Sequence, residues 1–260
     1  MSGVIAVLGF GEAGSLIARD LVAAGAPVRG FDPKVPPPEG VVGADSDAEA
    51  VIGADLVLSL NSAGDAVAAL TASLNALAPG AVWADLNTAS PAVKRRLADI
   101  GAGRGILVTD IAMMAPVPGK GLRVPMLASG DAEYAAVTLR GYGADVEILD
   151  GPAGLAAARK LLRSVFYKGM SASIVEALEA AEAAGLEDWL RPHIAEELAA
   201  ADASTVERIV TGTRQHAVRR GHEMAAAAEM LTALGVPPIM ADASRALHER
   251  LADENRPSAG

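Results

Sequence analysis

The sequence predicts an α/β N-terminal domain, built on a largely parallel, doubly wound sheet, followed by an all-α C-terminal domain. Short apolar runs alternate with helical segments through residue 150, as is typical of a parallel sheet. A glycine-rich turn follows the first apolar run, and no convincing strand remains after residue 151. We therefore expect a dinucleotide-binding domain at residues 1–150 and a helical domain for substrate and subunit contacts at 151–260.

Composition narrows the class of protein. The 260 residues are 51% hydrophobic but only 3% aromatic, so the core must consist of Ala, Leu and Val. A net charge of −10 argues against a general nucleic-acid binder. The absence of cysteine excludes disulfides and thiolate chemistry. No leader and no long apolar run is recognisable, so we expect a cytoplasmic protein that binds neither nucleic acid nor membrane.

The first strand, Val4 to Leu8, leads into a G-x-G-x-x-G motif and a helix that ends at Gly25. In this context the first glycine permits a tight turn, the second lets the backbone approach a pyrophosphate, and the third allows close packing of helix on strand. The helix N-terminus offers unpaired N–H groups to the anion. The motif predicts a Rossmann-type cofactor site that includes Gly9, Phe10, Gly11, Glu12, Ala13 and Gly14.

A second strand, Val28 to Phe31, ends at Asp32, 18 residues after Gly14. A carboxylate at this place accepts a hydrogen bond from a ribose 2′-hydroxyl and repels a 2′-phosphate. We expect NAD as cofactor. NADP stays possible because Arg29 and Lys34 lie nearby. The alternative role for Asp32 is a cap on its own turn.

The alternation continues with strands expected at 55–60, 81–84 and 106–109, and with a mixed extension at 124–128 and 145–149. Ligands of such sheets bind outside the carboxyl ends of the strands. Polar residues follow these ends and make Asn61, Ser62 and Thr88 further cofactor candidates. The stretch from Met113 to Gly119 is expected to be irregular.

A long helix is predicted from Pro152 to about residue 184, where Gly185 suits the stop. It carries one polar stripe at helical spacing, Lys160, Ser164, Tyr167 and Ser171, flanked by Arg163 and Lys168. Cations, hydroxyls and a phenol in this pattern suit an anion site with a proton donor. The alternative is a solvated face of an amphipathic helix.

Three more helices are expected, at 189–199, at 202–233 with Asp202 as a cap, and from the Pro237-Pro238 break to about residue 253, with a frayed tail at 254–260. His222 and Glu223 lie on the second of them. The histidines show no zinc spacing, so we expect no metal site.

Three motifs resemble signatures of the β-hydroxyacid dehydrogenase family, the relatives of 6-phosphogluconate and 3-hydroxyisobutyrate dehydrogenases. They are the glycine loop 9–14, the D-x-N-T-x-x-P sequence at 85–91, and a glycine-and-lysine pattern at 151–164. In the third, Ala156 replaces a glycine and Ser164 replaces an asparagine. The details GFGEAG at 9–14 and KLLRSVFYKG at 160–169 resemble a branch with a short helical C-terminal domain.

The resemblance implies an NAD(P)-dependent oxidoreductase that transfers a hydride between nicotinamide and a small hydroxy acid or keto acid-like anion. Lys160 takes the place of the catalytic lysine, with Ser164 and Tyr167 on the same stripe. The family's substrate loop aligns with 110–116, where Met114 replaces a serine. Substrate contacts are expected from Met113, Met114, Ala115, Arg163, Lys168 and His222. The resemblance also implies a homodimer formed through the helical domain.

Two other functions remain open from the sequence. One is an imine reductase, which shares this architecture and usually carries Asp or Tyr at the lysine position, so that Tyr167 becomes relevant. The other is a non-catalytic NAD-binding sensor or scaffold, which needs the glycine loop but has no use for Lys160.

Overall fold

The computed structural model describes residues 3–256. The chain divides into two compact units, Met1–Arg163 and Ser164–Gly260, and the division falls inside helix α6 (Leu155–Ala183). The boundary that we expected after residue 150 precedes this helix. Of the tail expected to be frayed, residues 254–256 are described and residues 257–260 lie outside the described part of the chain.

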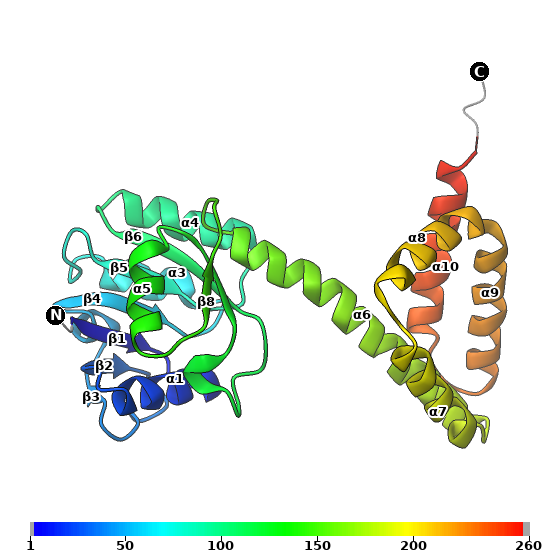
Figure 1. Cartoon of the computed structure of the whole chain (residues 1–260), viewed down its shortest axis with the longest axis horizontal. Coiled ribbons are helices and arrows are strands. Elements are labelled where there is room, and N and C mark those ends of the chain that lie inside the picture. Colours follow the sequence, from blue (N-terminus) through cyan, green and yellow to red (C-terminus); the bar gives the residue numbers. More distant parts are fainter. Residues whose placement is uncertain (1–2, 257–260) are drawn as a thin grey trace. The chain divides into compact units, whose positions relative to one another are not determined.

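The first unit is built on one sheet of eight strands with the order β3-β2-β1-β4-β5-β6-β7-β8 (Figure 1). Strands β1 to β6 are all parallel, whereas β7 runs antiparallel to β6 and parallel to β8. The predicted doubly wound sheet with a mixed extension is confirmed. The strands are β1 (Val4–Leu8), β2 (Val28–Phe31), β3 (Val42–Gly43), β4 (Ala54–Ser59), β5 (Val82–Asp85), β6 (Leu107–Met113), β7 (Met126–Gly130) and β8 (Val146–Ile148).

Helices connect these strands, and three short elements, namely β3, α2 and a 3₁₀ turn, were not predicted. The helices are α1 (Glu12–Ala23), α2 (Asp47–Ala50), α3 (Ala66–Ser73), α4 (Pro91–Ala102) and α5 (Glu133–Gly141), with a 3₁₀ turn at Gly121–Arg123. Strand β3 and helix α2 are too short to show a hydrophobic period. Our irregular segment also began too early, because Met113 still pairs with Met126 in the antiparallel ladder.

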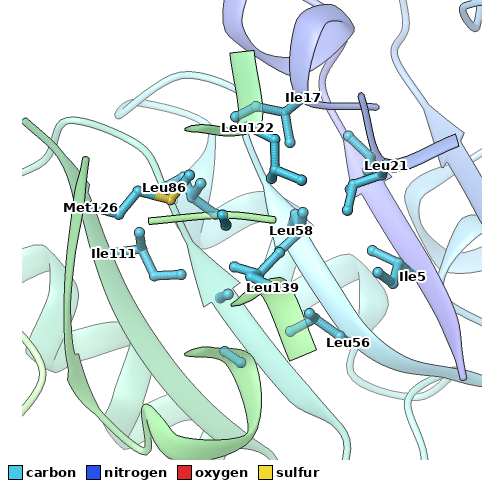
Figure 2. Close-up of a cluster of buried hydrophobic side chains, with 14 of the residues drawn as sticks. Ile5, Ile17, Leu21, Leu56, Leu58, Leu86, Ile111, Leu122, Met126 and Leu139 are labelled. Atoms are coloured by element: carbon cyan, nitrogen blue, oxygen red, sulfur yellow. The ribbon is translucent and has the colours of Figure 1, made fainter. Parts of the chain in front are cut away.

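Both faces of the sheet are buried under helices. Along β1, Ile5 and Val7 belong to one apolar cluster while Ala6 and Leu8 belong to the other. This follows from the two-residue period of a strand. Figure 2 shows the first cluster, in which side chains of the sheet meet Ile17 of α1 and others from the surrounding helices. Full burial of a side chain of this size contributes about 1.5–3 kcal/mol.

The second unit contains the end of α6 and the helices α7 (Glu187–Ala199), α8 (Ala203–Gln215), α9 (Ala217–Ala233) and α10 (Ile239–Glu254). The single helix expected at 202–233 is wrong, because His216 leaves the helical conformation (φ −111°, ψ 24°) and divides it into α8 and α9. Asp202 is the predicted cap and forms a capping box with Thr205.

The core of the second unit is small. Helices α9 and α10 lie side by side (Figure 1) and form, with α6, an apolar cluster of Ala180, Ala228, Leu231 and Ala241. Alanine buries little surface, so this cluster contributes less than the cores of the first unit. Within residues 3–256, no helix combines the length and the apolar character needed to cross a membrane.

Candidate active site

The glycine loop between β1 and α1 is closed toward the protein and open on one side. Gly9 has φ +97°, and a Cβ there would lie 2.5 Å from the carbonyl oxygen of Leu60. A Cβ on Gly14 would lie 2.0 Å from the carbonyl oxygen of Gly9, whereas a Cβ on Gly11 would meet no atom within 4 Å. The loop thus leaves its free space at Gly11, where a pyrophosphate needs to approach the backbone.

The start of α1 is suited to an anion. Gly11 is its N-cap residue, and no described side chain caps the helix there. Glu12, Ala13 and Gly14 form the first turn, whose N–H groups point toward the loop. The side chain of Phe10 is buried beneath the loop. All six predicted residues of the motif therefore belong to one turn with a free helix N-terminus.

Asp32 is held beside this loop by backbone donors. The N–H of Phe10 donates to Oδ2 at 2.7 Å, and the N–H groups of Lys34 and Val35 donate to Oδ1 at 2.8 and 2.9 Å. Burial alone would raise the pKa of Asp32, but these hydrogen bonds and the charge of Lys34 outweigh it and lower that pKa. Asp32 thus caps its turn, the alternative we considered, and is also a fixed negative charge at the loop.

A second carboxylate, which we did not predict, contributes to the same electrostatic environment. Burial raises the pKa of Asp47 at the start of α2, and the charges of Asp32 and Asp65 raise it further. We did not predict helix α2, and without this helix there was no reason from the sequence to expect Asp47 near Asp32. The environment around Asp32 is acidic, which disfavours a 2′-phosphate.

Two predicted cofactor residues follow β4. The hydroxyl of Ser59 donates to Asn61 Oδ1 at 2.8 Å, and the hydroxyl of Ser62 donates to Asp65 Oδ2 at 2.7 Å. The backbone at this point also pairs with β1, because Leu60 N donates to the carbonyl of Leu8 at 2.7 Å. Asn61 is therefore held close to the end of β1, from which the glycine loop starts.

Lys160 and Thr88 are brought together although they are 72 residues apart in the chain. Lys160 Nζ donates to Thr88 Oγ1 at 3.0 Å. Thr88 follows the carboxyl end of β5, and Lys160 is part of the second turn of α6. A cavity of about 10 Å³ adjoins the pair and is lined on its other sides by Asn87, Asp110 and Ala157. Two residues predicted for different roles thus share one location.

Beneath this pair lies a buried ionic network that we did not predict. Lys94 of α4 is 1% exposed, and its Nζ lies 2.6 Å from Asp85 Oδ2 and 3.0 Å from Asp110 Oδ1. The ammonium also donates to the carbonyl oxygen of Asp85 at 2.7 Å. A signal was present in the sequence, because Lys94 shares the buried face of α4 with Leu97 and Gly101.

The network continues to the N-terminus of α6. Asp110 Oδ2 accepts from the N–H groups of Gly154 at 3.0 Å and Ala157 at 2.9 Å. The hydroxyl of Ser129 donates to the same oxygen at 3.3 Å and accepts from the N–H of Ala156 at 3.1 Å. These bonds satisfy the helix N–H groups that otherwise lack partners, so Asp110 and Ser129 fix the start of α6.

The other predicted substrate residues are distributed over several elements. Met113 ends β6, Met114 N donates to the carbonyl of Pro125 at 2.8 Å, and Met114 and Ala115 are partly buried against the core. Ser164, Tyr167 and Lys168 follow on α6, as does Arg163 at the end of the first unit. His222 is exposed on α9 in the second unit. No metal-binding group of three or more His, Asp or Glu residues occurs in the described range.

Comparisons with known proteins agree with this arrangement. Residues 4–124 match the family described as the NAD binding domain of 6-phosphogluconate dehydrogenase, and residues 181–251 match a domain of unknown function, DUF1932. A probable 3-hydroxyisobutyrate dehydrogenase of Mycobacterium bovis is 32% identical over 199 residues, which cover 70% of this chain and 65% of that protein. The chain thus matches just under two thirds of the length of this curated relative.

Two solved structures extend the comparison to almost the whole chain. A conserved hypothetical protein from Sinorhizobium meliloti 1021 is 29% identical, with a TM-score of 0.62, covering 97% of this chain and 88% of the other. An imine reductase variant from Myxococcus stipitatus in complex with NAD⁺ has a TM-score of 0.80 at 19% identity, covering 98% and 95%; it shares the fold. The chain thus combines, at residues 4–124, a match to the NAD binding domain of 6-phosphogluconate dehydrogenase with a match to DUF1932 at residues 181–251.

Proposed function

We propose that the protein is an NAD(P)-dependent oxidoreductase that acts on the CH–OH group of a small hydroxy acid, or on the corresponding keto acid. The observation that carries the proposal is the 3.0 Å hydrogen bond from Lys160 Nζ to Thr88 Oγ1 at the carboxyl end of the sheet. It places a proton donor beside the edge at which such sheets bind their cofactors. The 3-hydroxyisobutyrate dehydrogenases among the relatives support the same chemistry.

The described residues fit a dinucleotide. The loop is open at Gly11, α1 presents uncapped N–H groups, and Asp32 is held ready for a ribose hydroxyl. When bound, the nicotinamide supplies or accepts the hydride. We assign the remaining cofactor contacts to Asn61, Ser62 and Thr88.

Lys160 acts as general acid or base in this proposal. In the reducing direction its ammonium donates a proton to the substrate oxygen, and in the oxidising direction its amine removes the hydroxyl proton. The hydroxyl of Thr88 orients the Lys160 side chain through the bond between them. Ser164 and Tyr167 follow on the same helix, and Arg163 and Lys168 attract the anionic group of the substrate. We propose that Met113, Met114, Ala115 and His222 contact the substrate.

The proposal is tested by following reduced cofactor in a screen of 2- and 3-hydroxy acids and of keto acids, and then by substitution. Lys160→Ala should lower kcat by about 10²–10⁴ with little change in NADH affinity. Lys160→Arg should be nearly as damaging, because a guanidinium keeps its proton near neutral pH. The exposed Lys120 is the matched control, and Lys120→Ala should leave kcat unchanged. Full turnover by Lys160→Ala would refute the assignment and make Tyr167 the next candidate.

Imine reduction is the second candidate, because the fold is shared with solved imine reductases. Cyclic imines belong in the same screen with both reduced cofactors. Turnover of imines, together with loss of activity in Tyr167→Phe and retention in Lys160→Ala, would favour this reaction. NADH binding with no turnover of any substrate class would favour a sensor or scaffold.

We also propose a homodimer formed through the helical part of the chain. Three apolar side chains at helical spacing (i, i+3, i+4) on one side of α6 are exposed: Leu162 by 71%, Val165 by 75% and Phe166 by 68%. A single chain leaves this row in water, and the small core of the second unit adds little stabilisation of its own. A second copy of the chain accounts for both features.

A further inference from the structure

We infer that Lys94 is a positioning residue, which sets the geometry of Thr88 and Lys160 by joining the end of β5 to the start of α6. This inference rests on the proposed function for its consequences in catalysis, although the structural part is independent of it. Lys94 would act from beneath the site, through the two carboxylates that it contacts.

The ammonium group of Lys94 has three buried contacts. It donates a hydrogen bond to the carbonyl oxygen of Asp85 at 2.7 Å and forms ion pairs with Asp85 Oδ2 at 2.6 Å and Asp110 Oδ1 at 3.0 Å. Among the described residues, Lys94 is the sole partner of both Asp85 Oδ2 and Asp110 Oδ1. The lysine and the two carboxylates therefore form a closed unit that solvent does not reach.

Lys94 supplies most of the positive charge that faces the two buried carboxylates. Two buried carboxylates face one ammonium, and the remaining negative charge lies on the side of Asp110 that accepts two N–H groups from the start of α6. A helix N-terminus is equivalent to about half a positive charge. Without Lys94, two buried carboxylates would lie close together without a cation, an arrangement that favours uptake of a proton by one of them.

Each carboxylate accepts a hydrogen bond from a residue that is close in the chain to Thr88 or to Lys160. Asn87 Nδ2 donates to Asp85 Oδ1 at 2.6 Å and is the neighbour of Thr88 in the chain. Ala157, whose N–H donates to Asp110, lies three residues before Lys160, less than one helical turn away. Lys94 thus connects the segment that carries Thr88 with the segment that carries Lys160. The hydrogen bond from Lys160 to Thr88 is a second, direct connection between the same two segments.

Lys94→Met is the test substitution, because it keeps a long apolar side chain and removes only the ammonium. We expect kcat to fall about tenfold or more, NADH affinity by fluorescence to change less than twofold, and the pH–rate profile to gain an ionisation from the carboxylate that takes up a proton. The exposed neighbour Arg95 provides the control, since Arg95→Met should change none of these. A lower Tm with unchanged kcat and pH profile would show a merely structural role and overturn the inference.

A double variant shows whether Lys94 positions the site or only compensates the buried negative charge. It also provides a folded protein to test if Lys94→Met alone does not fold. In Lys94→Met/Asp85→Asn the surplus buried charge is removed, so Tm should recover and the new ionisation should disappear. The connection to Asp110 is still absent, so kcat should remain low. Recovery of full kcat in the double variant would mean that Lys94 only balances charge, and the positioning role would be wrong.

Amide hydrogen exchange distinguishes failure of this inference from failure of the proposed function. Without any substrate, exchange at Ala156 and Ala157 should accelerate about tenfold in Lys94→Met and in the double variant, and stay unchanged in Arg95→Met. Unchanged exchange overturns the inference even if the wild type is an active dehydrogenase. If the wild type converts no substrate, the proposed function fails, and accelerated exchange still supports the connection between Lys94 and α6.

Discussion

At the scale of single residues, hydrogen bonds from the backbone determine the charge state of Asp32. Three N–H groups donate to its carboxylate and lower its pKa despite partial burial. Asp32 is therefore ionised at any pH above the ordinary pKa of an aspartate. A lowered carboxylate pKa stabilises the fold above the unfolded-state pKa, and this contribution is lost as pH falls through the lower, folded-state pKa. Both the charge and the local stabilisation therefore persist between pH 5 and 8.

We predict from this that NADH binds more tightly than NADPH and that the preference is constant between pH 5 and 8. Asp32→Ala should narrow the difference, because it removes the charge that repels a 2′-phosphate. Calorimetry with both cofactors measures the two affinities. Equal or tighter binding of NADPH by the unmutated protein would contradict the prediction.

The residues of the site differ in how far sequence alone could reveal them. The loop geometry at Gly9, Gly11 and Gly14 follows from the motif, and Lys160 is singled out by its stripe and by the family resemblance, while the roles of these residues in binding and catalysis stay predictions. Lys94 was not identified, since a lysine beside Arg95 and Arg96 suggests a solvated helix face. Its spacing with Leu97 and Gly101 was a weak local signal, but the cause of its burial is the long-range approach of Asp85 and Asp110, which no local pattern contains.

At the scale of elements, the start of α6 depends on one glycine. Gly154 has φ +103°, and a Cβ there would lie 2.9 Å from the carbonyl oxygen of Pro91. Its N–H donates to Asp110, so the unusual conformation is part of the cap that holds α6. A side chain at this position would therefore collide with the backbone at the start of α4.

Gly154→Ala should therefore destabilise the protein by about 1–3 kcal/mol, from strain at positive φ. Gly141→Ala in the last turn of α5 is the matched control, because its Cβ would meet no atom within 4 Å. That change should be neutral or stabilising by up to about 1 kcal/mol. Urea unfolding of both variants gives the comparison, and equal stabilities would show that Gly154 is not strained.

Most elements were predictable because each has a local signal, such as the apolar run of β1 or the proline and serine at the start of α4. The break at His216 has no such signal. Residues 202–233 contain no proline, and the glycines within them lie elsewhere, so helix propensity favours one continuous helix. Packing of α8 and α9 on α10 provides the missing constraint.

At the scale of the whole molecule, we predict a dimer at about 10 µM by light scattering, since a row of apolar side chains of this kind favours association. Phe166→Glu should shift the protein to monomer, because a carboxylate in an apolar interface is costly. Val42→Glu, at an equally exposed apolar position on β3, is the control and should stay dimeric. A monomeric wild-type protein at this concentration would contradict the proposal.

The open space at Gly11 makes a separation-of-function variant available. A methyl group there meets no protein atom and φ is −61°, so Gly11→Ala should fold normally while it obstructs the pyrophosphate. Wild-type protein with NADH at 100 times its Kd should gain about 2.7 kcal/mol of stability, and Gly11→Ala should gain almost none. Thermal melts with and without NADH measure this, and an equal gain would place the pyrophosphate elsewhere. A cell that carries only the Gly11→Ala gene would contain the folded protein without bound cofactor, so its phenotype would show which cellular effects require cofactor binding and which require only the folded chain.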